Sequence, residues 1–184
     1  SASKATVNIE TLIKNEWKKK SEGEVSVLIY DKQGNLVASD KQTINIAKNS
    51  AENVNFQLQL DNPQLWSPES PYLYKAVVNV KNTKDNMSDQ IETRFGVRTL
   101  EFSAEKGFLL NGKSILLQGG CIHHDNGLLG AAAYDAAENR KITLLKNEGF
   151  NALRTAHNIP SEHFLNACDS IGMMVIDESF DQWL

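Results

Sequence analysis

Residues 149–178 read GFNALRTAHNIPSEHFLNACDSIGMMVIDE, and this stretch decides the fold of the second half of the chain. Two short apolar runs, 150–156 and 173–177, predict buried strands. Between them Ser161 can cap a helix and Gly172 can end it. A strand, a helix and a strand with short connections predict a parallel α/β unit, whose reactive side chains gather beyond the carboxyl ends of the strands.

The residues just upstream extend this unit by one strand and one helix. A buried strand is predicted from Ile115 to about Ile122. Asp135, with Glu138 three residues later, predicts the start of a helix that Gly149 ends. Before them, residues 108–113 read FLLNGK and predict a hairpin with an Asn-Gly turn. The apolar face of the helix is expected to hold Tyr134, Ala137, Ile142 and Leu145.

Up to about Arg98, apolar and polar residues alternate with the two-residue period of a sheet that has one buried face. Residues 31–35 (DKQGN) and 82–85 (NTKD) predict turns. About seven antiparallel strands are expected, as in an immunoglobulin-like sandwich, here without an inter-sheet cysteine pair. The alternating runs lie at Val25–Ile29, Val54–Leu60 and Ile91–Val97, with weaker ones near Val7, Leu36, Ile44 and Tyr74.

The composition excludes several classes of protein. With 41% hydrophobic and 23% charged residues, the chain of 184 residues has the composition of an ordinary globular protein. The net charge of −4 and the scattered Lys and Arg residues give no footprint for nucleic acid. No apolar run approaches the roughly 20 residues that span a bilayer. We expect no nucleic-acid and no membrane partner, and the compartment stays open between cytoplasmic and periplasmic or secreted.

Polar side chains follow each predicted parallel strand. Both cysteines and all four histidines lie after Arg98, so chemistry is expected in this half. Because the carboxyl ends of parallel strands meet at one edge of a sheet, we expect the polar groups to converge on one rim. They are His123, His124 and Asp125 after the first strand, Arg154 and His157 at the second, and Asp177, Glu178 and Asp181 at the third.

A metal site and a nucleophilic cysteine are two possible readings of this rim. His123 and His124 are adjacent, so on a strand they point to opposite faces, and no ligand set for a metal can be identified. Cys121 could pair with His157 as a nucleophile. A free cysteine in an apolar strand is more often small packing material, and Cys168 falls on an apolar helix face. We therefore expect no metal ligand and no identifiable cofactor here.

Carbohydrate chemistry is the third reading. Cleavage of a glycosidic bond needs two carboxyl groups on opposite sides of the bond and a ring of hydroxyl-binding groups around the sugar. The rim supplies the ring. Asp177 and Glu178 are adjacent and should diverge, so they do not form the catalytic pair. Trp66 and Trp183 could stack on sugar rings or serve as packing.

Several spaced motifs resemble glycoside hydrolase family 2, the group of β-galactosidases, β-glucuronidases and β-mannosidases. Residues 151–158 (NALRTAHN) and 168–178 (CDSIGMMVIDE) look like the family's signature. The resemblance is specific over about residues 60–184 and rests on position alone before them. The upstream segments that are similar to the family's passage from sandwich to barrel are DNPQLWSP (61–68), PYLY (71–74), FGVR (95–98) and FLLNGK (108–113).

The resemblance implies an immunoglobulin-like sandwich at residues 1–98 and the N-terminal part of a (β/α)₈ TIM barrel at residues 99–184. The family hydrolyses β-glycosides with retention, and Asn158, where many members have Tyr-Pro, looks like a β-galactosidase branch. Carried over, Arg154 would hold the nucleophile ionised and His157 would line the sugar site. His123 matches the histidine after the first barrel strand, and Asp177 with Glu178 matches the acidic pair at the end of the third.

The resemblance also implies that the catalytic residues lie elsewhere. The family's acid/base and nucleophile are glutamates near barrel strands four and seven, whereas this chain reaches strand three. We expect an internal fragment of a β-galactosidase that is itself inactive, with Trp183 and the rim residues binding a β-galactoside, and with magnesium or sodium possible in the parent. The alternatives are a β-glucuronidase, a β-mannosidase, a non-catalytic carbohydrate-binding module and a metal-dependent barrel hydrolase. An open barrel exposes a sheet edge and an apolar face, so we expect self-association through residues 100–184, or disorder there.

Overall fold

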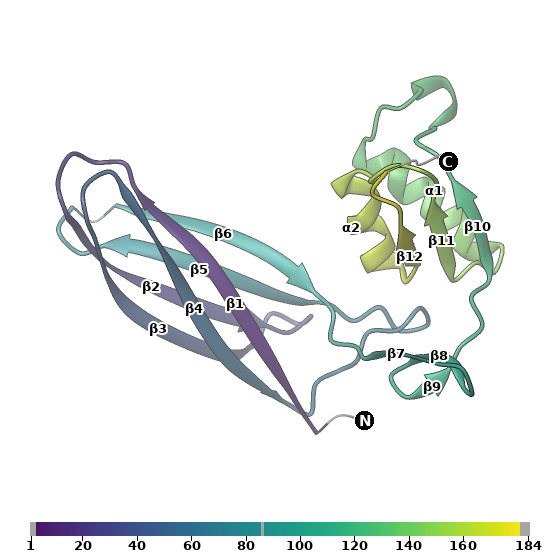
Figure 1. Cartoon of the computed structure of the whole chain (residues 1–184), viewed down its shortest axis with the longest axis horizontal. Helices are drawn as coiled ribbons and strands as arrows, with labels where there is room; N and C mark the ends of the chain where they lie inside the picture. The colour runs from purple at the N-terminus through teal and green to yellow at the C-terminus, as the bar shows by residue number, and fades with distance from the viewer. Residues whose placement is uncertain (1–2, 86, 181–184) are drawn as a thin grey trace. The chain divides into compact units, whose positions relative to one another are not determined.

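The computed structural model describes residues 3–85 and 87–180, whose elements fall into two compact units. The first unit holds the chain up to Gln64 together with Leu73–Phe95. The second holds Leu65–Tyr72 and the chain from Gly96 onward. Figure 1 follows the elements of both units along the chain. Among the described residues, no helix has the length and apolar character needed to cross a membrane.

The first unit is a sandwich of two antiparallel sheets, which confirms the prediction from the alternating sequence. One sheet pairs β1 (Lys4–Asn15) with β4 (Ser50–Asp61), and the other has the order β3-β2-β5-β6. These are the long strands in the purple to teal part of Figure 1. The second sheet consists of β2 (Ser21–Tyr30), β3 (Leu36–Ile46), β5 (Tyr74–Asn82) and β6 (Ser88–Phe95). The core contains Val25, Val27 and Ile29 of β2 and Val54, Phe56, Leu58 and Leu60 of β4, all buried.

The described part of this unit has six strands, so the expected count of seven is wrong. The runs near Leu36 and Ile44 belong to one strand, because β3 pairs with β2 along its whole length. The middle of β3 is polar and exposed, as suits the outer strand of the sheet. Ile91 was expected to be buried, yet it is 62% exposed. It lies on the edge strand β6, and the two-stranded sheet is too narrow to cover a sheet of four strands.

The second unit contains the predicted succession of strand, helix, strand, helix and strand. β10 (Gly119–Ile122), β11 (Ala152–Thr155) and β12 (Met174–Asp177) form a parallel sheet in that order. The helices α1 (Asp135–Asn147) and α2 (Glu162–Ile171) follow the first and second of these strands, and a 3-10 turn, η1 (Gly127–Leu129), precedes α1. The core that joins the helices to the sheet consists of Ile142, Leu153, Phe164, Ala167, Cys168 and Met173.

The ends of α2 confirm the sequence prediction, and α1 begins at Asp135 as predicted, although its cap differs from the expected one. Ser161 accepts a hydrogen bond from the amide of Phe164 at 3.1 Å, and Gly172 ends α2 in the left-handed conformation with φ of 88°. In α1 the cap position is Tyr134, whose side chain is 62% exposed rather than part of the buried face. The reason is that Tyr134 has extended backbone and lies outside the helical periodicity. Glu138 is buried and makes no capping box.

The prediction of a buried strand from Ile115 is wrong over its first half. β10 begins at Gly119, and Leu116 is 75% exposed. The preceding hairpin is confirmed, since Asn111 and Gly112 have φ of 53° and 73°, as a type I′ turn requires. It belongs to a small antiparallel sheet of β7 (Leu100–Ser103), β8 (Gly107–Leu110) and β9 (Lys113–Ser114).

Residues 65–72 are packed into the second unit although residues 73–95, which belong to the first unit, separate them from the rest of it. Trp66 is 2% exposed, and its indole Nε1 donates to the carbonyl of Asp169 at 2.8 Å. Lys146 Nζ donates to the carbonyls of Pro68 and Gly172, each at 2.8 Å. This segment therefore ties the ends of both helices together. Of the two roles considered for Trp66, stacking on a sugar ring and packing, the structure supports packing, because the ring is buried.

Candidate functional site

Glu178 is the centre of a polar cluster at the carboxyl ends of β11 and β12. One carboxylate oxygen accepts a hydrogen bond from Nε of Arg154 and forms an ion pair with its Nη2. The other oxygen lies 3.2 Å from Nδ1 of His157. Leu153 points into the helical core, so Arg154, the next residue along the strand, lies on the opposite face of the sheet. The face away from the helices therefore carries the site.

Arg154 also contacts Cys121, its partner in register on β10. Its Nη1 donates to Sγ of Cys121 at 3.2 Å. This hydrogen bond, followed by the contacts with Glu178, raises the pKa of Arg154 above its ordinary value. The guanidinium is thus a permanent cation that is held between two strands and balanced by one carboxylate.

Thr155 lies behind this cluster and links the ends of β11 and β12. Its buried hydroxyl donates to Oδ1 of Asp177 at 3.0 Å and accepts from the backbone amide of Glu178 at 3.2 Å. As expected, the two adjacent acidic residues diverge. Asp177 is bound by Thr155, whereas Glu178 reaches Arg154 and His157.

The two adjacent histidines also diverge. The centroid of the His123 ring lies 5.9 Å from the centroid of the His157 ring, so His123 is next to the cluster. Nε2 of His124 donates to the carbonyl of Ile159 at 2.9 Å, which connects the loop after β10 to the loop after β11. Asp125 accepts the amide of Gly127 at 2.8 Å and so folds its own loop.

The structure therefore brings together Arg154, His157, Glu178 and, beside them, His123. It places His124, Asp125 and Asp177 in supporting contacts around this group. Asp181 and Trp183 lie outside the described residues. Their expected part in binding a sugar stays a prediction.

The geometry gives little support to a metal site or to a nucleophilic cysteine on the rim. Across residues 3–85 and 87–180, no group of three His, Cys, Asp or Glu side chains is arranged to hold a metal ion. Cys121 was expected to be packing material within a buried strand, yet it is exposed and contacts Arg154. His157, which was considered as a possible base for Cys121, faces Glu178. Cys168 is buried in the helical core, as predicted.

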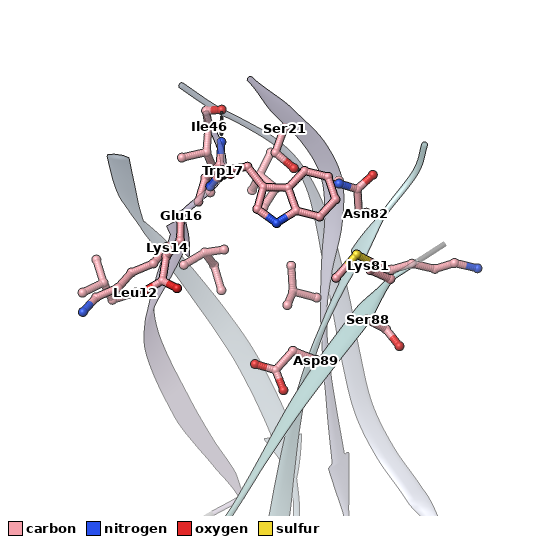
Figure 2. A pocket seen from close by; sticks show the side chains of 16 residues that line it. Leu12, Lys14, Glu16, Trp17, Ser21, Ile46, Lys81, Asn82, Ser88 and Asp89 are labelled. Atoms are coloured by element: carbon pink, nitrogen blue, oxygen red, sulfur yellow. Dashed lines mark hydrogen bonds between the residues drawn. The ribbon is translucent and has the colours of Figure 1, made fainter. Parts of the chain in front are cut away.

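A second hollow lies in the sandwich and is lined differently. This cleft of about 590 Å³ runs between the end of β1 and the start of β6. Figure 2 shows Trp17 at one end, near Ser21 and Asn82, and Asp89 at the other. Its exposed apolar side chains are Leu12 and Met87. Among the described residues that line the cleft, no ion pair like that between Arg154 and Glu178 is present, so the strand ends of the second unit are the better candidate site.

Sequence reasoning missed Thr155 and Glu138. Thr155 lies between Arg154 and His157 in the signature, and the two-residue period of a strand places it opposite Arg154. Glu138 lies four residues before Ile142, which indicates the buried face of the helix. A charged residue normally indicates exposure, and this outweighed the periodicity.

Models of one protein family match almost the whole chain. The model of glycosyl hydrolases family 2 matches residues 1–98. The model of the TIM barrel domain of glycosyl hydrolases family 2 matches residues 103–181. The chain also resembles the β-galactosidase BoGH2A of Bacteroides ovatus, with 36% identity over 179 residues, which are 97% of this chain and 21% of that protein. A putative β-glucuronidase of Formosa agariphila is 37% identical over 158 residues, which are 86% of this chain and 15% of that protein.

Solved structures give the same picture. A glycosyl hydrolase family 2 member from Bacteroides cellulosilyticus has a TM-score of 0.91 and 47% identity, and the match covers 100% of this chain and 25% of that one. The β-glucuronidase of Bacteroides uniformis has a TM-score of 0.88 and 30% identity over 94% of this chain and 21% of that one. The chain therefore spans between 15% and 25% of the length of these four relatives.

Proposed function

Because the chain belongs to glycosyl hydrolases family 2, we propose that it is part of a retaining β-glycosidase that hydrolyses terminal, non-reducing β-galactosides. Within that parent, residues 1–98 would form the immunoglobulin-like sandwich and residues 99–184 the first part of the TIM-barrel catalytic domain. The observation that carries the proposal is the convergence of Arg154, His157 and Glu178 at the carboxyl ends of parallel strands. This is the end at which barrel enzymes bind and convert their substrates.

Each group of the cluster has a role in this proposal. His123 and His157, whose rings are 5.9 Å apart, would contact sugar hydroxyls. Arg154 would hold a carboxylate nucleophile in its ionised form, because a nearby cation favours the charged state of an acid. Glu178 would fix the orientation of Arg154 by accepting from its Nε. The acid/base and the nucleophile would come from parts of the parent outside residues 1–184, so the chain alone is proposed to be inactive.

A β-glucuronidase is the second candidate. The relatives from Formosa agariphila and Bacteroides uniformis, which carry that name or the putative form of it, support it. The cluster itself favours a neutral sugar. In this proposal its cation, Arg154, already serves Glu178 and the nucleophile, so it is not available to a carboxylate of the substrate. A β-mannosidase and a non-catalytic carbohydrate-binding module remain further alternatives.

The test is an assay of the full-length parent on nitrophenyl β-galactoside, β-glucuronide and β-mannoside. We expect turnover of the β-galactoside with the highest kcat/KM, and proton NMR should detect the β-anomer of the sugar as the first product, because retention preserves the configuration. A higher kcat/KM on the β-glucuronide would mean that the proposed reaction is right and that the proposed sugar is wrong. Absence of turnover on all three, with sugar binding intact, would favour the non-catalytic module. The 184-residue chain is the matched negative control. Magnesium or sodium is a further proposal for the parent, tested by dialysis against chelator before the same assay.

A further inference from the structure

Glu138 is a charged residue in the core of the second unit that the proposed mechanism does not use. It lies on α1 and is only 3% exposed. Burial of a carboxylate removes its hydration, so a buried acid needs close partners to remain charged. An apolar residue at this position would pack with Ile142, one turn further along the helix, without that cost. The contacts of the carboxylate indicate what the charge does.

One of these contacts holds the loop that follows β10. Oε1 of Glu138 accepts a hydrogen bond from Nδ2 of Asn126 at 2.9 Å. Nζ of Lys141, one turn along the same helix, lies 3.0 Å from Oε2 and balances the charge. Since Lys141 belongs to the same helix as Glu138, the ion pair fixes only the carboxylate, whereas the bond to Asn126 joins two separate segments.

Asn126 in turn organises the loop around itself. Its Nδ2 donates to the carbonyl of Ala132 at 3.1 Å, and its backbone amide donates to the carbonyl of Gly130 at 2.8 Å. Its own carbonyl accepts the amide of Leu129 at 3.2 Å. The loop is exposed over most of its length, so these hydrogen bonds, rather than apolar packing, give it a defined shape.

The histidines of the rim belong to the same loop. His123 and His124 immediately precede Asp125 and Asn126, and the amide of Asp125 donates to the carbonyl of His123 at 2.8 Å. Glu138, His123 and His124 also line one small, partly open pocket of about 20 Å³, together with Thr155. Glu138 is thus adjacent to the groups that present both histidines.

We propose that Glu138 is a positioning residue for the histidine segment of the site, acting through Asn126 on the loop of residues 123–133. The proposal rests on the proposed function for its catalytic consequence. The carboxylate sets the path of the loop and thereby the place of the His123 ring beside His157. The buried ion pair is present for the geometry of the site rather than for the stability of the core.

Hydrogen exchange in the 184-residue chain tests the structural half of the proposal. Replacement of Glu138 by Leu is expected to speed exchange of the loop amides of Asn126, Leu129, Gly130 and Ala132 by about tenfold or more, because their hydrogen bonds then open without the anchor. Glu138→Gln keeps an oxygen that can accept from Asn126, so it should restore most of the protection. Glu162→Leu changes an exposed acid in the first turn of α2 and is the matched control. Unchanged exchange in the Glu138→Leu variant would overturn the proposal.

Kinetics of the full-length parent test the catalytic half. Glu138→Leu should raise KM for the preferred glycoside about tenfold while kcat changes less, because the sugar-binding histidine is displaced and the catalytic carboxylates are not. Asn126→Ala removes the same contact from the loop side, together with the hydrogen bond to the carbonyl of Ala132, so it should raise KM at least as much. The double variant should be no worse than Asn126→Ala alone, since the contact between Asn126 and Glu138 can be lost only once. Multiplicative losses in the double variant, or a wild-type KM in every variant, would contradict the proposal. If the parent turns over no glycoside, the proposed function fails while the exchange result still decides the role of Glu138.

Discussion

Adjacent residues of β11 face opposite sides of the sheet, and this alternation divides the strand between core and site. Leu153 packs with the helices, whereas Arg154 meets Cys121 and Glu178 on the other face. Thr155 is buried again and holds both the Asp177 carboxylate and the Glu178 amide. Two residues of β11, Arg154 and Thr155, thereby fix the contacts of the acidic pair at the end of the next strand.

Replacement of Arg154 by Lys is expected to lower kcat/KM of the proposed parent enzyme by about 100-fold or more. An ammonium group is a point charge and cannot keep both the contact with Cys121 and the two contacts with Oε1 of Glu178 that the guanidinium fork makes. The melting temperature of the 184-residue chain should barely change, because exposed ion pairs contribute little to stability. Steady-state kinetics and thermal unfolding measure the two effects. Arg140→Lys, exposed on α1, is the control, and a wild-type kcat/KM in the Arg154 variant would contradict the role.

Cys168 gives a pH dependence of folding whose sign is fixed by burial. Burial raises the pKa of this thiol from 9.0 to about 12. Above pH 9 the thiol of the unfolded chain loses a proton that the folded chain keeps, so the free energy of unfolding falls as the pH rises from 9 toward 12. Below pH 9 the thiol is protonated in both states and does not make the free energy of unfolding depend on pH. We expect a loss of about 1.4 kcal/mol per pH unit in this window that is absent from Cys168→Ala. Urea unfolding at several pH values measures the slopes. Cys121→Ala, which removes an exposed thiol, should keep the wild-type slope, and equal slopes in all three proteins would refute the assignment.

The residues of the site were predictable in part. The motif after each strand predicts that Arg154, His157 and the acidic pair lie at one end of the sheet, and their contacts agree with this. Which of Asp177 and Glu178 reaches Arg154 was not predictable. Successive residues face opposite sides of a strand, so a shift of one residue in where β12 ends exchanges the two. Only the pairing of β12 with β11 fixes that register.

At the scale of the element, the sequence predicts where helices end, but it does not predict which strands lie side by side in a sheet. Ser161 and Gly172 bound α2 through local hydrogen bonds and a local backbone conformation, which a short stretch of sequence specifies. The single long strand β3 and the exposed edge strand β6 follow from which strands lie side by side in the sheet. A single sequence carries no direct signal for that order. The packing of Pro68 against Gly172 is hidden for the same reason.

Alanine substitution of the two glycines that follow the helices can separate two causes of destabilisation, the strain of a positive φ and the steric clash of an added Cβ. Gly149 and Gly172 have φ of 90° and 88°, so an alanine at either position is strained. A Cβ at Gly149 meets nothing within 4 Å, whereas a Cβ at Gly172 would lie 2.3 Å from the carbonyl oxygen of Pro68. We expect Gly149→Ala to lower the free energy of unfolding by about 1 kcal/mol and Gly172→Ala by about 3 kcal/mol or more. Urea unfolding measures both losses. Equal losses would mean that the segment of residues 65–72 can move away from a Cβ at position 172 at no cost in free energy.

At the scale of the whole molecule, the second unit presents an open sheet. Among the described strands, β10 and β12 each pair on one side only, with β11. Large apolar side chains are exposed on this unit at Phe102, Leu116, Leu128 and Phe180. Contiguous apolar surface and free strand edges favour association. In relatives of which the chain spans only 15% to 25%, most of the protein lies outside the matched part and is available to cover such surfaces.

The 184-residue chain is therefore expected to self-associate through residues 100–184. Sedimentation velocity over about a 100-fold range of protein concentration should show the mean sedimentation coefficient rising with concentration, because association follows mass action. The double variant Leu116→Lys with Leu128→Lys places charges on exposed apolar positions of the second unit and should shift the rise to higher concentration without loss of folding. Leu36→Lys makes the same exchange on the exposed edge strand β3 of the sandwich and should leave the rise unchanged. A compact, well-ordered monomer at every concentration would show that the open sheet is stable by itself. An equal shift in the Leu36 variant would place the association on the sandwich instead.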